Sequence, residues 1–383
     1  MQFTFTAEQQ QFRDVVQRFL KDKSATTEVR RLMETEEGYD CAVWQQMSEE
    51  LALAAIPIPE SYGGAGFGFV ELGIVMEEMG RSLLCAPYFS SIILAAHAIL
   101  NAGNEEQKQS LLPRIASGKI RASLAMTEAD GRWDLAGIKM DARVSGNEVI
   151  LNGVKSFVVD GGTADMLVVV SRLAGSQGTE GIVFATVNGD APGLTKRNLD
   201  TMDATRKLGH LEFKDVSATL LGDEHELKSS AGSEALSQTM DQAAIALANE
   251  MIGGAQYLLD STIAYTAIRM QFGRVIGSFQ AIKHKCANML IQLELAKSAA
   301  YYAAAAIEAV DAEVPMLASM AKAAASDAYM LIATEAIQIH GGIGFTWDQD
   351  TQLWFKRAKS SEVFLGDPTY HRELVIQRWK EQS

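Results

Sequence analysis

This 383-residue sequence has few cysteines, fewer basic than acidic residues, and no apolar run of membrane-spanning length. Cys41, Cys85 and Cys286 are isolated, so we expect neither a metal site nor a disulfide framework, and a reducing cytoplasm fits. The net charge of −14, without a basic block, argues against nucleic-acid binding. The apolar run at residues 90–100 is shorter than the roughly 20 residues that a membrane span needs. The first residues lack a basic stretch followed by an apolar core, so no signal peptide is expected.

The length and the hydropathy pattern predict an α+β protein of several domains. A chain of 383 residues exceeds one ordinary core, and a hydrophobic content of 48% can fill two or three. Helical periodicity marks residues 1–121 as an N-terminal helical domain and residues 227–383 as a C-terminal bundle of long helices. Short runs between turn signals mark residues 122–226 as a central β-barrel or sandwich.

Local signals make further predictions inside these regions. Asn152-Gly153 stands between two apolar stretches and predicts a β-hairpin turn. Glu77 and Glu78 lie in a helical run and are predicted to form a solvated face. Pro315 suits the first turn of a long helix.

Residues 265–280 combine an arginine, an aromatic residue and two glycines between long helical runs. Arg269 and Phe272 are three apart, so a helix would place them on one face. Gly273 and Gly277 would then let the backbone leave the helix, because glycine adopts backbone angles that other residues avoid. A guanidinium beside an exposed aromatic ring can hold a phosphate and support a planar ring system. The alternative is a helix end with a surface arginine and a core phenylalanine.

The motif R-x-Q-F-G-x-x-I-x-x-F-Q, from Arg269 to Gln280, resembles the signature of the flavin-dependent acyl-CoA dehydrogenases. The resemblance extends over nearly the whole chain. It implies the helix–barrel–helix fold of that family, FAD as the cofactor and an acyl-CoA thioester as the substrate. In the family a carboxylate removes the α-proton and the β-hydrogen leaves as hydride to the flavin, which gives α,β-desaturation. An electron-transferring flavoprotein is the implied acceptor.

The resemblance also implies which residues contact FAD. The segment after Glu128 lacks the Ser that touches the flavin phosphate in the family, and Val159 replaces a Thr that hydrogen-bonds to the flavin. The site for this chain's own flavin is therefore expected to be degraded, whereas the half lent to a neighbouring subunit is expected to be intact. His340, beside that half, is predicted to be a packed or capping histidine. The implied FAD contacts are Met126, Thr127, Phe157, Val159, Arg269, Phe272, Gln280, Gln338, Gly341 and Gly342.

By the same resemblance, the catalytic base is missing from both places where the family carries it. Leu365 stands where most members have Glu, and Ala243 stands at the second location. An apolar side chain cannot accept a proton. Ala244 replaces the usual substrate-anchoring Arg, and Asp241 matches an acid that orients the substrate. Together with Gly366, these two complete the implied substrate positions.

Three explanations of the missing base stay open. Asp241 or Asp367 could serve, its pKa raised by desolvation; another subunit could supply the base; or the protein could bind acyl-CoA without removing the α-proton. The second explanation resembles the two-gene α2β2 enzymes of steroid side-chain catabolism, whose defective chain complements a partner that carries the Glu. The segments that resemble this defective chain are Gly131-x-Trp133-Asp134, Lys155-x-Phe157-Val158, Asp203-x-Thr205-Arg206 and Leu365-Gly366-Asp367-Pro368.

We therefore expect a FAD-dependent acyl-CoA dehydrogenase of lipid or steroid catabolism, assembled with a homologous dehydrogenase subunit that supplies the base. One alternative is a self-sufficient homotetramer with a non-standard base. Another is a non-catalytic subunit that completes a partner's FAD site. An oxidase or a desulfinase on the same fold is a further alternative.

Overall fold

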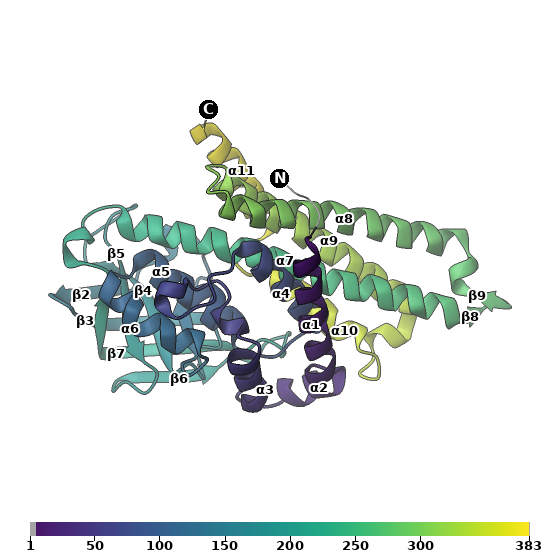
Figure 1. Cartoon of the computed structure of the whole chain (residues 1–383), viewed down its shortest axis with the longest axis horizontal. Helices are drawn as coiled ribbons and strands as arrows, with labels where there is room; N and C mark the ends of the chain where they lie inside the picture. The colour runs from purple at the N-terminus through teal and green to yellow at the C-terminus, as the bar shows by residue number, and fades with distance from the viewer. Residues whose placement is uncertain (1–4, 383) are drawn as a thin grey trace. The chain divides into compact units, whose positions relative to one another are not determined.

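The structure is a computed structural model that describes residues 5–382. The chain divides into two compact units, one from residues 32–68 and 85–243 and the other from residues 5–31, 69–84 and 244–382. We call the first the barrel unit and the second the bundle unit, and Figure 1 shows the path of the chain through both. The helices of the first 121 residues are shared between them.

A closed β-barrel forms the centre of the barrel unit. Strands β2, β3, β7, β5 and β4 pair in that order, and β4 pairs with β2 to close the ring. β1 lies parallel to β4 outside the ring, and β6 lies antiparallel to β7. Inward-pointing apolar residues fill the interior, so the predicted barrel is confirmed. The strands are β1 Ala122–Ala125, β2 Asp141–Ser145, β3 Glu148–Val159, β4 Met166–Leu173, β5 Ile182–Asn188, β6 Leu194–Asn198 and β7 Leu208–Leu221.

Short helices complete the barrel unit. η4 is held on β1 by Ser91, whose Oγ donates to the carbonyl oxygen of Ala122 at 3.1 Å and accepts from its N–H at 3.0 Å. α6 begins with a capping box between Asn104 and Gln107. These helices are α3 Cys41–Gln45, η1 Gln46–Glu50, η2 Leu53–Ala55, η3 Glu60–Tyr62, η4 Phe89–Ala96, α5 His97–Ala102, α6 Glu105–Ala116, η5 Leu135–Gly137 and η6 Glu224–Glu226.

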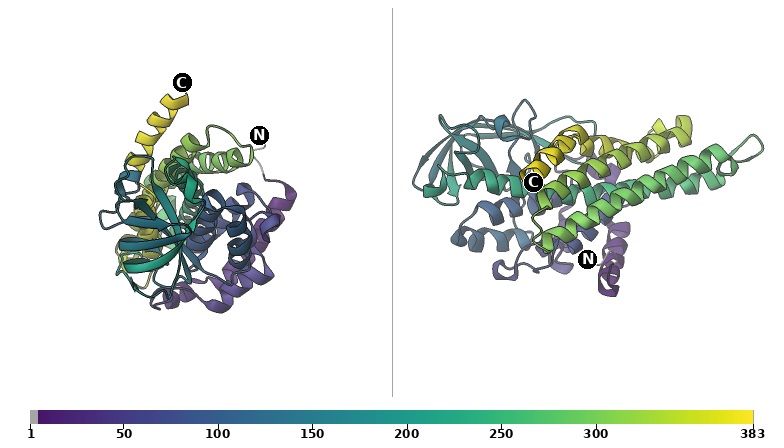
Figure 2. Two further views of the ribbon diagram at one scale, coloured as in Figure 1. Left: turned by 90° about the vertical axis from the view of Figure 1, so that its left-hand side faces the viewer. Right: turned by 90° about the horizontal axis from the view of Figure 1, so that it is seen from above.

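Long helices build the bundle unit. α8 and α9 pack along each other, as Figure 2 shows, and α10 and α11 pack against α9. Pro315 stands in the first turn of α9, as predicted. α11 was not predicted from the sequence. The elements are α1 Ala7–Lys23, α2 Thr26–Met33, α4 Phe69–Arg81, α7 Ala231–Ile268, β8 Met270–Gln271, β9 Arg274–Val275, η7 Ile276–Ser278, α8 Gln280–Glu308, α9 Val314–His340, η8 Gly341–Phe345, α10 Thr351–Val363 and α11 Pro368–Gln382; α2 and α7 cross into the barrel unit.

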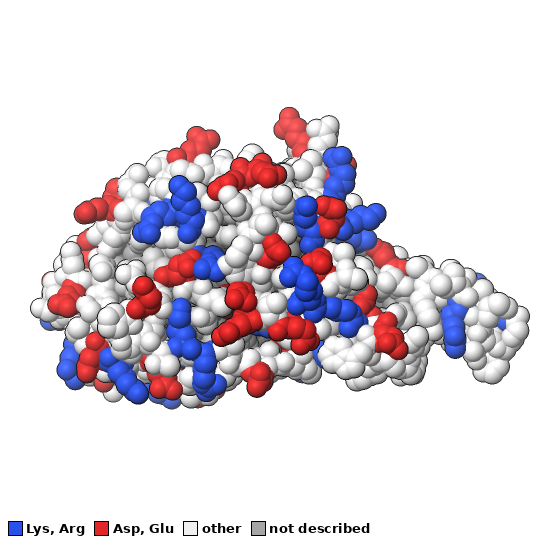
Figure 3. All heavy atoms as spheres, turned by 90° about the horizontal axis from the view of Figure 1, so that it is seen from below, with Lys and Arg blue, Asp and Glu red and all other residues white. Residues whose placement is uncertain are grey.

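Two further observations concern the helices and the surface charge. Within residues 5–382, none of the helices is both long and apolar enough to cross a membrane. On the face shown in Figure 3, acidic and basic side chains alternate, and no basic block covers it.

The predicted solvated face for Glu77 and Glu78 is wrong, because α1 and α8 cover this part of α4. The two residues are only 4% and 2% exposed. Arg13 Nη2 lies 2.8 Å from Glu77 Oε2, and Arg13 Nη1 lies 3.5 Å from Glu78 Oε1. The Tyr301 hydroxyl donates to Glu77 at 2.8 Å. Burial and the neighbouring Glu77 raise the pKa of Glu78, and the shared guanidinium makes the buried pair tolerable.

The predicted hairpin turn at Asn152-Gly153 is also wrong. β3 continues through both residues, and the turn between β2 and β3 falls at Gly146, which has a φ of +59°. Opposite Asn152, β7 bulges at Asp215. Asn152 Nδ2 donates to Asp215 Oδ1, and the Asp215 N–H donates to Asn152 Oδ1, both at 2.9 Å. The Asn-Gly pair therefore marks a bulge between long strands.

Candidate functional site

The segment after β1 is tied to the end of β3, where the resemblance predicts flavin contacts. Thr127 Oγ1 donates to the carbonyl oxygen of Ser156 at 2.5 Å, and the Ser156 N–H donates to the Thr127 carbonyl oxygen at 2.9 Å. The Met126 carbonyl oxygen accepts from Lys155 Nζ at 2.9 Å. These bonds fix Met126 and Thr127 against β3.

Lys155 is a buried cation under this junction. Its side chain is 0% exposed, and its Nζ lies 2.8 Å from Glu128 Oε1. The same carboxylate oxygen accepts from the backbone N–H groups of Lys139 and Met140, each at 2.9 Å. Burial lowers the pKa of Lys155, and the Glu128 carboxylate opposes that shift. The pair anchors the segment after β1, because removing either partner would leave the other as a buried charge without its counter-ion.

Phe157 presents its ring to solvent at this junction. It is 40% exposed, whereas Met126, Thr127 and Val159 are buried. Its φ of +60° is unusual for an aromatic residue. A Cβ atom at Gly131 would lie 3.7 Å from Phe157 Cε2, so the segment after β1 passes the edge of the ring. An exposed ring on a fixed strand can stack against a planar group.

Arg269 and Phe272 lie on a β-hairpin, so the prediction that a helix aligns them is wrong. α7 ends at Ile268, and β8 and β9 pair around a turn formed by Phe272 and Gly273. These two residues have φ of +53° and +77°, the signature of a type I′ turn. Phe272 is 90% exposed, so the alternative of a core phenylalanine is wrong as well.

The hairpin and the end of α9 lie at the same end of the bundle. Tyr265, in the last turn of α7, stacks on His340 with 4.2 Å between ring centroids. Lys285, early in α8, is hydrogen-bonded to Glu335, late in α9. The structure thereby brings together the predicted flavin residues of the bundle unit. All of them are exposed: Arg269, Phe272, Gln280, Gln338, Gly341 and Gly342.

His340 is a packed histidine, as predicted, and the glycines after it leave open space. Its Nδ1 lies 2.8 Å from the Ala336 carbonyl oxygen. Burial lowers its pKa. Among residues 5–382, and apart from the adjoining residues and the local helix backbone, no atom lies within 4 Å of a Cβ placed on Gly341 or Gly342. Gly341 has a φ of +66°, which disfavours any side chain. Another molecule can therefore approach the backbone closely here.

This end of the bundle fits an anionic, ring-bearing ligand. Within the described chain, the Arg269 guanidinium forms no hydrogen bond or ion pair. A free guanidinium beside exposed amides and open glycine backbone suits a pyrophosphate. Exposed apolar side chains surround these groups, which is typical of an interaction surface. They are Ile268, Met270, Phe272, Ile343, Phe345 and Trp347.

Leu365 is buried in the connection between α10 and α11. Leu365 and Gly366 have φ of +61° and +101°. His371 Nε2 lies 3.0 Å from the Leu365 carbonyl oxygen, and Lys322 Nζ donates to the Gly366 carbonyl oxygen at 3.1 Å. The connection is therefore held firmly, with a hydrocarbon side chain at the position that the resemblance gives to the base.

Lys322 is the buried cation of the bundle unit near that connection. Its Nζ also donates to the Glu362 carbonyl oxygen at 3.1 Å and to Ser326 Oγ at 3.0 Å. No carboxylate is within bonding distance among these partners, so burial lowers the Lys322 pKa to about 7. Burial and the nearby Lys322 charge lower the pKa of His371 to about 3.

The remaining predicted residues differ in their surroundings. Asp367 Oδ1 accepts from the Tyr370 N–H at 2.8 Å, so this exposed carboxylate caps the first turn of α11. Asp241, Ala243 and Ala244 are buried on α7. Neither alanine provides an ionisable group.

Two polar pairs were missed from the sequence. Glu250 on α7 and Arg357 on α10 form a buried ion pair at 2.8 Å. Ser156 Oγ lies 2.8 Å from Nδ1 of His210 on β7. Each pair joins residues far apart in the chain, so no local sequence pattern predicts it.

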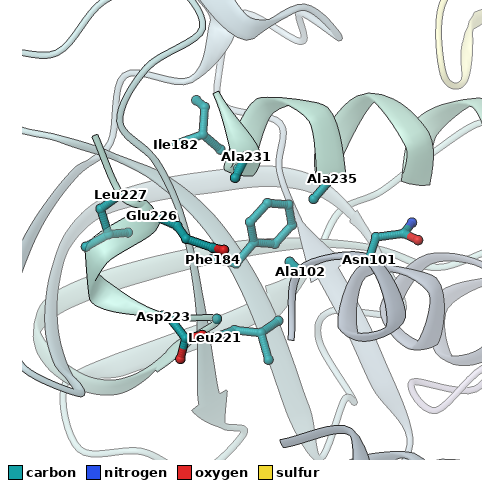
Figure 4. Close-up of a pocket in the computed structure, with 12 residues that line it drawn as sticks. Asn101, Ala102, Ile182, Phe184, Leu221, Asp223, Glu226, Leu227, Ala231 and Ala235 are labelled. Atoms are coloured by element: carbon teal, nitrogen blue, oxygen red, sulfur yellow. The ribbon is translucent and has the colours of Figure 1, made fainter. Parts of the chain in front are cut away.

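A hollow in the barrel unit lies apart from all the predicted residues. Its floor includes Phe184, and Asp223 and Glu226 stand at its rim, with Glu226 reaching across the opening toward Phe184 (Figure 4). α7 begins beside it, and a Cβ atom on Gly232 would lie 2.3 Å from the Ile182 carbonyl oxygen. The hollow is therefore a gap in the packing beside the close contact of α7 with β5.

Comparison with known proteins gives consistent matches along the chain. Models of the N-terminal, middle and C-terminal domains of acyl-CoA dehydrogenases match residues 6–119, 123–216 and 230–380. The acyl-CoA dehydrogenase IpdE2 of Mycolicibacterium smegmatis is 32% identical over 361 residues, covering 94% of this chain and 95% of that protein. Butyryl-CoA dehydrogenase from Megasphaera elsdenii superposes with a TM-score of 0.89 at 27% identity, covering 98% of both chains. A chain of the Tcur3481-Tcur3483 steroid ACAD superposes with a TM-score of 0.86 at 27% identity, also covering 98% of both chains. The chain belongs to the FAD-dependent acyl-CoA dehydrogenase family.

Proposed function

We propose that this chain is one subunit of a heteromeric acyl-CoA dehydrogenase, and that a homologous partner supplies the base for α,β-desaturation. The observation that carries the proposal is the hydrocarbon side chain at both expected base positions, Leu365 and Ala243. A buried leucine in a firmly held connection cannot be exchanged for a nearby carboxylate by a small movement. The hydrogen bonds that hold this connection support the proposal, because they keep the leucine at the position in question.

The exposed end of the bundle would complete the FAD site of a neighbouring subunit. Arg269 would pair with the pyrophosphate, and Gly341 and Gly342 would let the nucleotide approach the backbone. Phe272 would lie against a ring of the cofactor. Within the described residues the Arg269 guanidinium has no hydrogen-bond or ion-pair partner, and the exposed apolar residues around it support burial by another chain.

The barrel unit would offer a weaker half-site for its own flavin. FAD, when bound, accepts the hydride from the acyl group. Met126 and Thr127 would line the ring edge, and Phe157 would support its face. Val159 contributes no hydrogen bond, so this half would orient the ring less firmly.

The proposed substrate class is a bulky acyl-CoA of lipid or steroid catabolism. The similarity to the acyl-CoA dehydrogenase IpdE2 supports an acyl-CoA substrate, and the similarity to a steroid ACAD supports the bulky acyl group. Ala243 and Ala244 take little space on α7, and Asp241 and Gly366 would complete the substrate side. An electron-transferring flavoprotein is the proposed acceptor. A reducing cytoplasm is the proposed location, supported by three free cysteines.

Two other functions remain as competitors. A self-sufficient homotetramer would need Asp241 or Asp367 as its base; the capping bond of Asp367 disfavours that residue, because taking up a proton would weaken the cap. A non-catalytic subunit would complete the partner's FAD site and contribute no chemistry.

The test is expression of the chain alone and together with the dehydrogenase gene beside it in the genome. We expect little flavin and little acyl-CoA turnover from the chain alone. The co-expressed pair should have an α2β2 native mass. It should bind one FAD for each site that the two chains complete together. Rapid turnover by a pure homo-oligomer would contradict the proposal, and Asp241→Asn and Asp367→Asn would then identify the base. Oxygen consumption or sulfite release would indicate the oxidase or desulfinase alternatives.

A further inference from the structure

A β-bulge re-aims the aromatic residue in the barrel half-site. In the register of β3 on β7, Ser156 and Phe157 together oppose the single residue His210. The extra residue interrupts the alternation of side chains, and Phe157 takes a φ of +60°. Bulges of this kind bend a strand and redirect a side chain. The exposed ring of Phe157 is the result.

Ser156 is the fixed point of this bulge. It is buried, and its backbone N–H and carbonyl oxygen are both bonded to Thr127 at 2.9 and 2.5 Å. Its hydroxyl lies 2.8 Å from His210 Nδ1. His210 Nε2 in turn lies 3.6 Å from Glu212 Oε1. The Ser156 hydroxyl can donate to Nδ1 while the Nε2–H group faces the Glu212 carboxylate.

We propose that His210 is a positioning residue for the flavin half-site: its hydrogen bond with Ser156 holds the bulge that presents Phe157. The inference rests on the proposed function, because it takes Phe157 as a flavin contact. Phe157 has particular weight here, since Val159 is apolar and the other predicted barrel contacts are buried.

The bond matters because it opposes a change of register. If Ser156 were released, β3 could pair with β7 without the extra residue, and a one-residue slip turns side chains to the opposite face. The left-handed backbone at Phe157 favours that release, since an aromatic residue prefers negative φ. His210 stands directly across from the bulge, so its side chain is placed to prevent the slip.

The experiment compares four variants in the assembly that binds FAD. His210→Phe keeps a ring but cannot accept from Ser156, whereas His210→Gln can. Phe157→Ala removes the proposed contact itself. His225→Phe is the control, because His225 is an exposed histidine of the same unit. The FAD dissociation constant and the visible flavin spectrum are measured for each.

Phe157→Ala is expected to weaken FAD binding about tenfold, as loss of aromatic stacking does. His210→Phe is expected to weaken it about fivefold, as loss of one hydrogen bond does, and to shift the spectrum in the same direction. His210→Gln should restore both values, and the control should not differ from the parent. If Phe157→Ala has its effect and His210→Phe has none, the inference is wrong and the proposed function stands. If neither variant affects FAD binding, the placement of flavin at Phe157 is wrong. The inference and the barrel half-site of the proposed function are then both wrong.

A second measurement needs no flavin. Amide hydrogen exchange at Phe157 and Val158 in the flavin-free chain should quicken about fivefold in His210→Phe and should not change in the control. Unchanged exchange would overturn the inference. If His210→Phe does not fold, Ser156→Ala removes the same bond from the other side, and the same changes are expected of it.

Discussion

The two predicted halves of the flavin site differ in how their residues are held. In the barrel unit, Thr127, Lys155 and Ser156 are tied together by buried hydrogen bonds. In the bundle unit, Arg269 and Phe272 stand exposed on a two-residue turn, and within the described chain the guanidinium has no partner. The first half is organised by its own chain. In the second half, the chain fixes the backbone of the turn and leaves the side chains of Arg269 and Phe272 exposed.

The comparison predicts different consequences for the same kind of substitution. Loss of a cation from the barrel half should damage the fold, because a buried charge is left behind. Loss of a cation from the exposed end should leave the fold intact and damage only what binds there.

Lys155→Met should have the largest effect on stability. The variant leaves the Glu128 carboxylate partly buried without its ammonium partner, and we expect a loss of about 3 kcal/mol in the free energy of unfolding. Urea denaturation measures it. Lys139→Met is the matched control, since Lys139 pairs with Asp130 at the surface and should cost less than about 1 kcal/mol. Equal losses in the two variants would show that burial of the Lys155 pair has no special weight.

Lys322 tests whether a buried cation also controls stability in the bundle unit. Its pKa is lowered from 10.5 to about 7 in the folded chain, so folding releases a proton between these values. Stability should therefore rise with pH in that window and be lost as the pH falls toward 7. Between about pH 7.5 and 9, the free energy of unfolding should increase by about 2 kcal/mol more in the parent than in Lys322→Met. Urea denaturation across this range measures the difference. Lys228→Met, at an exposed position, should keep the parent's slope.

Arg269→Ala should separate binding from folding. We expect FAD affinity in the assembled protein to fall about tenfold or more, because a charge-assisted bond to phosphate is lost. The unfolding transition of the flavin-free chain should stay within about 0.5 kcal/mol of the parent. Arg274→Ala is the control on the same hairpin, where the guanidinium lies over the Phe279 ring, 3.9 Å from its centroid. A large loss of stability in Arg269→Ala would remove the contrast between the two halves.

Phe272→Ser should have the smallest effect on the isolated chain. The side chain is almost fully exposed, so stability should change by less than about 0.5 kcal/mol. Association with the partner subunit should nevertheless weaken, which sedimentation at several concentrations would detect. An unchanged association constant would mean that the exposed ring is not part of an interface.

The order of elements could be predicted from the sequence because it depends on local periodicity. Residues 122–226 alternate between short apolar runs and turn signals, and the barrel strands follow from that pattern. The long helices of the bundle follow from their composition. Leu365 and Ala243, at the two positions where the resemblance expects the base, can be identified from the sequence alone, and the loss of the base there stays a prediction.

What could not be predicted depends on partners distant in the chain. Asn152-Gly153 reads as a turn until Asp215, on another strand, is seen to pair with it. Glu77 appears solvated until Arg13 and Tyr301 are found against it. The positive φ of Phe272 contradicts the usual preference of an aromatic residue, so no propensity rule would place it in a type I′ turn.

Closure of the barrel limits where another polypeptide chain could extend the sheet. Because β4 pairs with both β2 and β5, the five strands of the ring offer no free edge on which a second polypeptide could extend the sheet. Most of the exposed large apolar side chains lie instead on helices and a short hairpin. Extension of the sheet by another chain is therefore confined to β1 and β6, two short strands that lie outside the ring.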